Sequence, residues 1–276
     1  MPVLLAVAAV WIWWGNRTIQ LTRLAVESHR LPAAFEGFTI AQVSDLHNAS
    51  FAGGQEKLLG LLRDARPDII AVTGDLIDAN HSDPKAVLAF AKGAVEIADV
   101  YYVTGNHEAW YAGYSDLEEQ LKQAGVTVLR DEAFSLRREG QSVRLVGLDD
   151  PAFSRESRLL GEQSVAWEAK LRQLTQGEEY TILLSHRPEM FDSYRSCGVD
   201  LVLSGHAHGG QVRIPFLGGL VAPDQGIFPR YTAGLYREEE TGMVVSRGLG
   251  NSVVPIRINN RPELVLVTLR DGRNGQ

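Results

Sequence analysis

The feature that most constrains the fold is an alternation of apolar runs and helical patterns in the first half of the chain. Three runs predict buried strands, over Phe38–Asp45, Asp68–Asp75 and Val100–Asn106. Between them the apolar spacing predicts helices over Gln55–Ala65 and Asp83–Ala98, the second opened by an Asp-Pro pair. Strands that alternate with helices form right-handed βαβ units, so we expect a largely parallel sheet with both faces covered.

The second half of the chain contains further strand-like runs whose spacings mix hairpins with crossovers. They cover Val143–Leu148, Tyr180–His186, Leu201–His206, Met243–Arg247 and Leu264–Leu269. Partial alternation over Thr18–Leu31 predicts one or two more strands. We therefore expect an α/β protein in which a second sheet packs on the first, and 276 residues suit a single unit of this kind.

Charge and cysteine content exclude two classes of protein. Lys and Arg total 27 against 34 Asp and Glu, a net charge of −7, which argues against a nucleic-acid partner. Cys197 is the single cysteine, so a thiolate-cluster metal site is ruled out. Any metal must be held by His, Asp, Asn or Glu side chains.

Polar residues with metal-binding side chains lie at the ends of the predicted strands. Five of the seven histidines are among them. The set is Asp45, His47, Asp75, Asn106, His107, His186, His206 and His208. Ligands collect beyond the carboxyl ends of parallel strands, and residues two apart on extended backbone, such as Asp45 and His47 or His206 and His208, point to one side.

Taken singly, each of these residues is explained by a hydrogen-bonded core histidine or a Gly-Asp turn. Together, two carboxylates, an amide and several imidazoles without a cation would carry a large desolvation and repulsion cost. Divalent ions neutralise the carboxylates and accept imidazole nitrogens, so the set predicts a metal centre. Gly74, Gly105 and Gly205 precede these residues and permit sharp turns and close backbone approach.

The motifs Asp-x-His, Gly-Asp-x-x-Asp, Gly-Asn-His-Glu, a single His and Gly-His-x-His follow one another from Asp45 to His208. This order resembles the calcineurin-like metallophosphoesterase superfamily. The resemblance implies a four-layer αββα sandwich of two mixed sheets flanked by helices. It also implies two divalent metal ions, and mixed nitrogen and oxygen ligands suit Mn, Fe, Zn or Co.

The resemblance implies a role for each matching residue. His107 would be the non-ligand histidine near the leaving group, and Asp78 would orient it. Two cations would lower the pKa of a water between them, so that a bridging hydroxide attacks phosphorus. The implied metal ligands are Asp45, His47 and His208 for one ion, Asn106, His186 and His206 for the other, and Asp75 as the bridge.

One departure bears on the substrate. Phosphoprotein phosphatases of this superfamily have Arg directly after the second Asp of Gly-Asp-x-x-Asp, whereas Ala79 follows Asp78 here. The stretches Gly205–Pro215, Ser246–Gly250 and Arg261–Glu263 are similar instead to the membrane-associated YkuE- and YaeI-like branch. That branch includes a UDP-2,3-diacylglucosamine pyrophosphatase that acts in lipid A synthesis.

The N-terminus begins with twelve apolar residues, Val3–Trp14, three of them tryptophans. This run is shorter than the roughly 20 residues of a spanning helix and suits a signal-like or interfacial segment. The alternatives are a buried N-terminal helix and an imprecise start codon. We expect a membrane-associating segment at residues 1–17 and a phosphoesterase domain at 18–276. Arg17, Arg23 and Arg30 follow the run, which favours the cytoplasmic face of the cytoplasmic membrane.

The segment Gly209–Tyr231, which follows His208, is unusually apolar for a loop. Its side chains either pack the loop onto the domain or meet acyl chains or the bilayer surface. They are Val212, Ile214, Phe216, Leu217, Leu220, Val221, Ile227 and Phe228.

These observations lead to one expected function and two alternatives. We expect a dinuclear metal hydrolase of phosphodiester or pyrophosphate bonds, with a lipid-linked substrate such as UDP-2,3-diacylglucosamine, at a membrane surface. The first alternative is a soluble general phosphodiesterase that acts on cyclic nucleotides or glycerophosphodiesters. The second is a metal-stabilised envelope-binding module without turnover.

Overall fold

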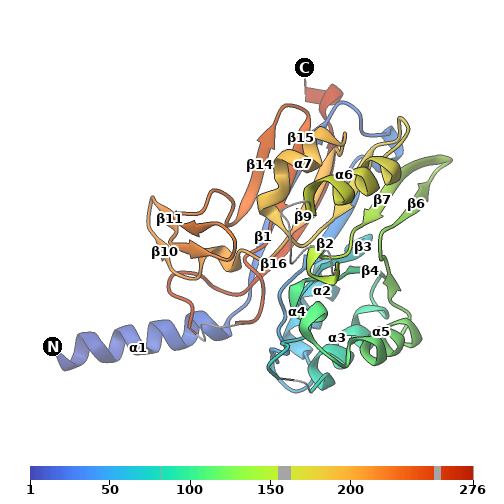
Figure 1. Cartoon of the computed structure of the whole chain (residues 1–276). Helices are drawn as coiled ribbons and strands as arrows, with labels where there is room; N and C mark the ends of the chain where they lie inside the picture. Colours follow the sequence, from blue (N-terminus) through green and yellow to red (C-terminus); the bar gives the residue numbers. More distant parts are fainter. Residues whose placement is uncertain (82, 155–162, 252–255, 276) are drawn as a thin grey trace.

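A computed structural model of the chain has four layers, in which two six-stranded sheets pack face to face and helices cover their outer faces (Figure 1). The structure describes residues 1–81, 83–154, 163–251 and 256–275. The expected αββα sandwich of two mixed sheets is confirmed.

The first sheet contains the N-terminal βαβ units and both ends of the domain. Its strands lie in the order β1 (Gln20–Ser28), β16 (Glu263–Asp271), β2 (Thr39–Val43), β3 (Ile69–Thr73), β4 (Asp99–Val103) and β5 (Thr127–Val128). Neighbouring strands are parallel except at the β16–β2 pair, so the sheet is largely parallel, as expected. β1 pairs with β16 along its whole length, which ties the start of the domain to its end.

The second sheet combines crossovers with hairpins. Its strands lie in the order β14 (Gly234–Glu238), β15 (Thr241–Val245), β9 (Leu201–Ser204), β8 (Thr181–Leu184), β7 (Gln141–Gly147) and β6 (Glu132–Arg138). The four inner strands are parallel, and the two outermost pairs are antiparallel. The parallel inner strands need crossover connections and the antiparallel outer pairs are joined by short turns, which explains the mixed spacing in the second half of the sequence.

Helices cover the outer face of each sheet. The first sheet carries α2 (Glu56–Ala65), α3 (Lys85–Ala94) and α5 (Tyr114–Gln123), and the second carries α6 (Gln163–Leu174) and α7 (Phe191–Ser196). In β3, Ile70 and Val72 pack with the helices, whereas Ile69 and Ala71 pack between the sheets. Because both faces of the strand are buried, its sequence is apolar without alternation.

The predicted strands are confirmed, but most of them end earlier than expected, whereas β16 extends to Asp271. β2 ends at Val43, β8 at Leu184 and β9 at Ser204, so the polar residues that follow lie in loops. Likewise the helix expected up to Ala98 ends at Ala94. The expected strand up to Asn106 ends at Val103, and Asn106 begins the short helix α4 (Asn106–Trp110).

The N-terminal apolar run forms helix α1 (Pro2–Arg17), which projects from the domain (Figure 1). Val3, Val10 and Trp13 are exposed, so the structure does not bury this helix. Its C-terminal end is anchored, because Asn16 Nδ2 donates to Arg257 O at 2.9 Å and Arg257 N donates to Asn16 Oδ1 at 2.8 Å. Within the described ranges, none of the helices has the length and hydropathy needed to cross a membrane.

Tight packing between the sheets gives a first prediction. A Cβ at Gly147 in β7 would lie 2.3 Å from Leu129 Cβ and 2.8 Å from Val103 Cγ1, whereas a Cβ at Gly242 in β15 would meet nothing closer than 3.6 Å. We expect Gly147→Ala to lower the free energy of unfolding by about 1–3 kcal/mol, as overpacked cores do. Gly242→Ala is the matched control, and equal chemical denaturation of the two variants would contradict this account.

Candidate metal centre

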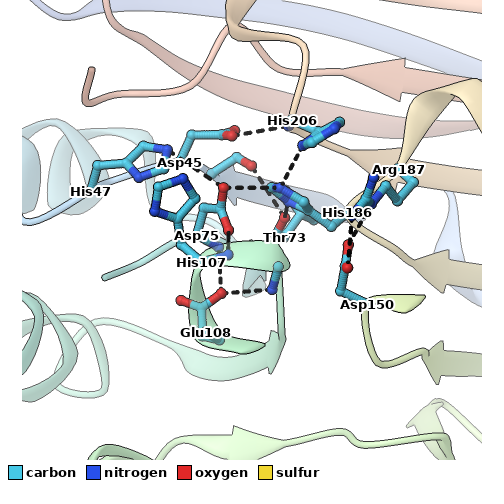
Figure 2. Close-up of polar contacts among 12 residues, drawn as sticks. Asp45, His47, Thr73, Asp75, His107, Glu108, Asp150, His186, Arg187 and His206 are labelled. Atoms are coloured by element: carbon cyan, nitrogen blue, oxygen red, sulfur yellow. Dashed lines mark hydrogen bonds and ion pairs between the residues drawn. The ribbon is translucent and has the colours of Figure 1, made fainter. Parts of the chain in front are cut away.

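Every residue that the sequence analysis assigned to a metal or to proton transfer lies in the connection that follows the carboxyl end of a strand, with Asn106 and His107 at the start of the short helix α4. The loops after β2, β3 and β4 come from the first sheet, and those after β8 and β9 from the second. Figure 2 shows Asp45, Asp75 and the histidines around them turned toward one another. All nine side chains are buried: Asp45, His47, Asp75, Asp78, Asn106, His107, His186, His206 and His208.

One group of possible ligand atoms joins the loops after β2 and β9. His47 Nε2 lies 3.2 Å from His208 Nε2, and His208 Nε2 lies 3.5 Å from Asp45 Oδ1. One ligand atom from each residue lies within 4.8 Å of the others. Two imidazole nitrogens that face each other beside a carboxylate are suited to share a cation.

A second group joins the loops after β3, β8 and β9. His186 Nε2 lies 3.2 Å from Asp75 Oδ2 and 3.2 Å from His206 Nδ1. The same Asp75 oxygen lies 3.6 Å from His47 Nε2, which belongs to the first group. Asp75 therefore stands between the two groups, where one carboxylate can contact two ions.

Unsatisfied polar atoms test whether these residues fit a metal. Asp45 Oδ2 and Asn106 Oδ1 are buried without a hydrogen-bond partner among the described residues. Leaving such atoms unpaired costs about 1–3 kcal/mol each, and more for a charged group. The donor set of carboxylate, amide oxygen and imidazole is one that a divalent transition metal accepts, so the residues fit.

Hydrogen bonds behind the possible ligand atoms orient two of the histidines. His186 Nδ1 lies 2.7 Å from the Thr73 carbonyl oxygen, which can only accept, so Nε2 faces the site with its lone pair. His206 Nε2 lies 2.9 Å from Asp224 Oδ2, which leaves Nδ1 toward the site. Such outer partners fix the tautomer of a ligating histidine and raise its basicity.

The buried Asp75 carboxylate needs a nearby positive charge. Burial disfavours protonated His186, but the Asp75 carboxylate outweighs burial and raises the pKa of His186 to about 10. Burial raises the pKa of Asp75, yet His186 and His47 bring it well below its usual value. Burial lowers the pKa of His47 to about 4, so this ring is neutral and able to ligate. Without metal, a proton on His186 balances Asp75, and a divalent ion supplies the same compensation.

The backbone of several site residues has a left-handed rather than an extended conformation, and this directs their side chains into the site. The expectation that Asp45 and His47, and likewise His206 and His208, lie on extended strands was wrong. Their φ angles are 51°, 44°, 64° and 46°, and that of Asp75 is 53°. Non-glycine residues held in this region cost of order 1–3 kcal/mol each and cluster at functional sites. The turns begin just after the strands, which explains why the strands end early.

The predicted close approach at glycines is confirmed. A Cβ at Gly205 would lie 2.4 Å from Asp45 Oδ2, and a Cβ at Gly105 would lie 2.2 Å from Asp75 Oδ1. Gly74 has φ +91°, a conformation that other residues rarely adopt. These positions let three loops converge on the two carboxylates.

His107 and Asp78 lie beside the two groups. Asp78 Oδ1 is 3.5 Å from His107 Nδ1, and Asp78 Oδ2 is 3.0 Å from His81 Nδ1. Burial raises the pKa of Asp78, but the Asn80 N–H and His81 outweigh burial and lower it, so this carboxylate is charged. The backbone N–H of Ala79 also donates to His107 Nδ1 at 3.1 Å. The ring of His107 is thus held at Nδ1 by the backbone N–H of Ala79, and the Asp78 carboxylate lies beside the same nitrogen.

Sequence reasoning missed Glu108, although it ends the motif Gly-Asn-His-Glu. Its Oε2 accepts from the backbone N–H of Asp75 at 2.9 Å and of Gly105 at 2.6 Å, and its Oε1 accepts from Ile77 at 3.2 Å (Figure 2). Burial first, and Asp75 second, raise the pKa of Glu108 to about 7, although these backbone donors lower it. Glu108 ties the Asp75 loop to α4.

A second set that sequence reasoning missed supports His206. Arg187 Nε and Nη2 donate to the Asp150 carboxylate at 2.6 and 2.9 Å, and Arg187 Nη1 donates to Asp224 Oδ2 at 2.5 Å. Asp224 in turn faces His206, as described above. Little in the sequence indicates these roles. Arg187 simply follows His186, and Asp224 lies in an irregular loop 18 residues beyond His206.

A cavity of about 700 Å³ opens beside these groups. Asp75, Asn106, His107, His206 and His208 line its polar side. The other side is mostly apolar and comes from Trp110 and the loop after His208, with Val212, Leu220, Val221, Ala222 and Pro223.

That loop folds into two small hairpins. They are β10 (Arg213–Ile214) with β11 (Gly218–Gly219), and β12 (Val221–Ala222) with β13 (Gly226–Ile227). Val212 and Leu220 are partly buried, so packing of the loop onto the domain explains why these two positions are apolar. Packing does not explain the apolar side chains that are exposed, which are Ile214, Phe216, Leu217, Val221, Ile227 and Phe228.

Similarity to known proteins assigns the family. The sequence model of the calcineurin-like phosphoesterases matches residues 38–210, more than half of the chain and all nine predicted site residues. This chain belongs to the calcineurin-like phosphoesterase family. Members are metal-dependent hydrolases that use two divalent ions, and the clusters described above are able to hold metal.

The resemblance to the YkuE- and YaeI-like branch is also confirmed. The metallophosphoesterase YkuE of Bacillus subtilis is 30% identical over 258 residues, which cover 91% of this chain and 86% of YkuE. The phosphodiesterase YaeI of Escherichia coli is 30% identical over 245 residues, which cover 84% of this chain and 82% of YaeI. Zebrafish transmembrane protein with metallophosphoesterase domain is 28% identical over 250 residues, which cover 87% of this chain and 55% of that protein.

Among solved structures, TT1561 of Thermus thermophilus has the same fold. Its TM-score is 0.51 at 15% sequence identity, and the superposition covers 77% of this chain and 90% of TT1561. At this identity the likeness concerns the fold alone. It agrees with the two-sheet sandwich described above.

Metal binding to the folded site predicts a gain in stability. We expect Mn, added to chelator-treated phosphoesterase, to raise the melting temperature, because a hundredfold excess over the dissociation constant stabilises by about 2.7 kcal/mol. His208→Ala should lose most of this shift, and His29→Ala, a histidine far from the site, should keep it. No shift with Mn, Fe, Zn or Co would contradict the metal centre.

Proposed function

We propose that this phosphoesterase hydrolyses phosphodiester or pyrophosphate bonds of a lipid-linked substrate, with two divalent metal ions. The observation that carries the proposal is the convergence of seven buried donor side chains beside a cavity with an apolar wall. Their mixed nitrogen and oxygen atoms suit Mn, Fe, Zn or Co. In this proposal one ion is held by Asp45, His47 and His208, the other by Asn106, His186 and His206, and both by Asp75.

When bound, such ions activate a water for attack on phosphorus and take up charge on the phosphate oxygens. The chain supplies the proton for the leaving oxygen through His107, which lines the cavity. Proton donation of this kind contributes about 10² to 10⁴ in rate. Asp78, whose Oδ1 lies 3.5 Å from His107 Nδ1, orients the ring.

The shape of the cavity favours a substrate with a polar and an apolar part. A phosphodiester or pyrophosphate would lie against the metal side, and acyl chains against Val212, Leu220 and Val221. UDP-2,3-diacylglucosamine has both parts. Ala79 stands where phosphoprotein phosphatases have their arginine, so the site lacks that grip on a phosphoprotein.

We assign residues 1–17 to membrane association and residues 18–276 to the catalytic domain. α1 exposes tryptophans, which prefer the headgroup region of a bilayer, and it is 16 residues long. With Arg17, Arg23 and Arg30 on the cytoplasmic side, the domain would lie at the inner face of the cytoplasmic membrane.

Hydrolysis of bis-p-nitrophenyl phosphate tests the catalytic roles. With Mn, the wild-type protein should release nitrophenol, and Asp75→Asn and His186→Ala should abolish release because each removes a ligand of the metal pair. His29→Ala is the control and should retain the wild-type rate. Full activity in both site variants would refute the ligand assignment.

A second assay tests the substrate class. We expect kcat/KM for UDP-2,3-diacylglucosamine to exceed that for its deacylated analogue by at least about tenfold, because apolar contacts discriminate by this much or more. Val212→Ser should reduce the preference without loss of bis-p-nitrophenyl phosphate hydrolysis. Equal turnover of the two substrates, or preference for cyclic nucleotides or glycerophosphodiesters, would favour the soluble phosphodiesterase. Metal binding with no turnover of any ester would favour the envelope-binding module.

A further inference from the structure

Exposed large apolar side chains of the described chain gather in three segments. These are α1, the two hairpins within residues 213–228, and the stretch 256–258, which carries Ile256 and Ile258. Outside them, within the described residues, only Met1, Trp110 and Phe134 are large, apolar and exposed. Scattered apolar residues need no explanation, but a gathered set of this size marks an interaction surface.

Hydrogen bonds connect the three segments into one surface. Asn16 at the end of α1 exchanges two hydrogen bonds with the backbone of Arg257. Next to Arg257, the Ile258 carbonyl accepts from Arg213 N of β10 at 3.0 Å, and Ile258 bridges to Val212. Figure 1 shows α1 and the β10–β11 hairpin projecting on the same side of the molecule.

The hairpin ends expose their apolar side chains to an extent that packing within this chain does not explain. Phe216 is fully exposed, and Ile227 and Phe228 are 71% and 63% exposed. Each belongs to a turn or to the last residues of a hairpin, beyond the walls of the cavity. The described chain does not cover these side chains, and an apolar partner would gain free energy by removing them from water.

The charge of the surface identifies the partner. Residues 1–17, 209–231 and 256–261 contain five arginines and one acidic residue, Asp224, although the whole chain has a net charge of −7. Of the five, Arg257 is buried and Arg230 pairs with Glu238. Arg17, Arg213 and Arg261 have no ion pair within the described part of the chain. Arg17 lies over Trp13 and Arg261 over Trp14, at 5.0 and 4.7 Å from the ring centroids. Arginines and tryptophans around an apolar patch match the anionic headgroups of a bilayer.

We infer that α1, the two hairpins and residues 256–258 form a single docking surface for an anionic lipid bilayer, into which Phe216 and Phe228 insert. The surface borders the active site, because Val221 is exposed on it and also lines the cavity. A lipid headgroup can thus reach the metal centre while its chains stay in the membrane. This last step rests on the proposed function, whereas the docking itself does not.

Vesicle binding by the full-length protein tests the surface. We expect binding to phosphatidylcholine vesicles that contain phosphatidylglycerol and little binding to pure phosphatidylcholine. The double variant Phe216→Ser/Phe228→Ser, with α1 intact, should bind the anionic vesicles roughly tenfold more weakly or worse, since each side chain loses its burial in lipid. Phe134→Ser, an exposed residue on β6, is the matched control and should bind like the wild type. Melting temperatures verify that all variants fold.

Several results would overturn the inference. Wild-type binding by the double variant would assign membrane contact to α1 alone. Equal binding to both kinds of vesicle would show that the arginines do not attract anionic headgroups, which contradicts the proposed preference for an anionic bilayer. Intact vesicle binding with loss of turnover only for acylated substrates would make the hairpins an acyl-chain site. Docking as expected without hydrolysis of any ester would support this surface and refute the proposed function, so the two failures are distinguishable.

Discussion

The charge of Asp75 is the constraint on which the rest of the site depends. This carboxylate is buried between the two sheets' loops, where an uncompensated charge is costly. His186 and His47 from opposite sheets face it, and Glu108 holds the backbone on either side of it. The left-handed turns and the glycine contacts serve to bring these groups together. The four-layer fold brings five loops together at one edge of the sheets. The side chains on those loops compensate the buried negative charge of Asp75.

Much of the fold could be predicted from the hydrophobic pattern, because strands that are buried on both faces appear as apolar runs. β2, β3 and β4 are largely apolar runs, and the helices α2 and α3 between them show amphipathic spacing. The short edge strand β5 and the hairpins were not predicted, because two-residue strands have no measurable period. Helix α6 was missed as well, and its apolar residues Trp167 and Leu171 pack against the outer face of the second sheet. Tertiary contacts, rather than local pattern, define these elements.

The sequence predicted the site residues that belong to motifs at the ends of strands. It did not predict residues that reach the site only through contacts between distant loops. All nine predicted residues converge, although the left-handed backbone at Asp45 and His208 was not foreseen, since non-glycine residues rarely adopt it. Asp150, Arg187 and Asp224 act on His206 through a chain of contacts between distant loops, for which sequence offers no spacing. Exposure of the apolar hairpins required the structure, because the same residues could equally have packed inward.

Anomalous diffraction from crystals grown with Mn tests the central claim most directly. The account predicts two manganese peaks about 3.5–4 Å apart, as in two-metal hydrolases. One should contact Asp45, His47 and His208, the other Asn106, His186 and His206, and Asp75 should contact both. A single peak, peaks that avoid Asp75, or no peak among these side chains at saturating Mn would contradict it.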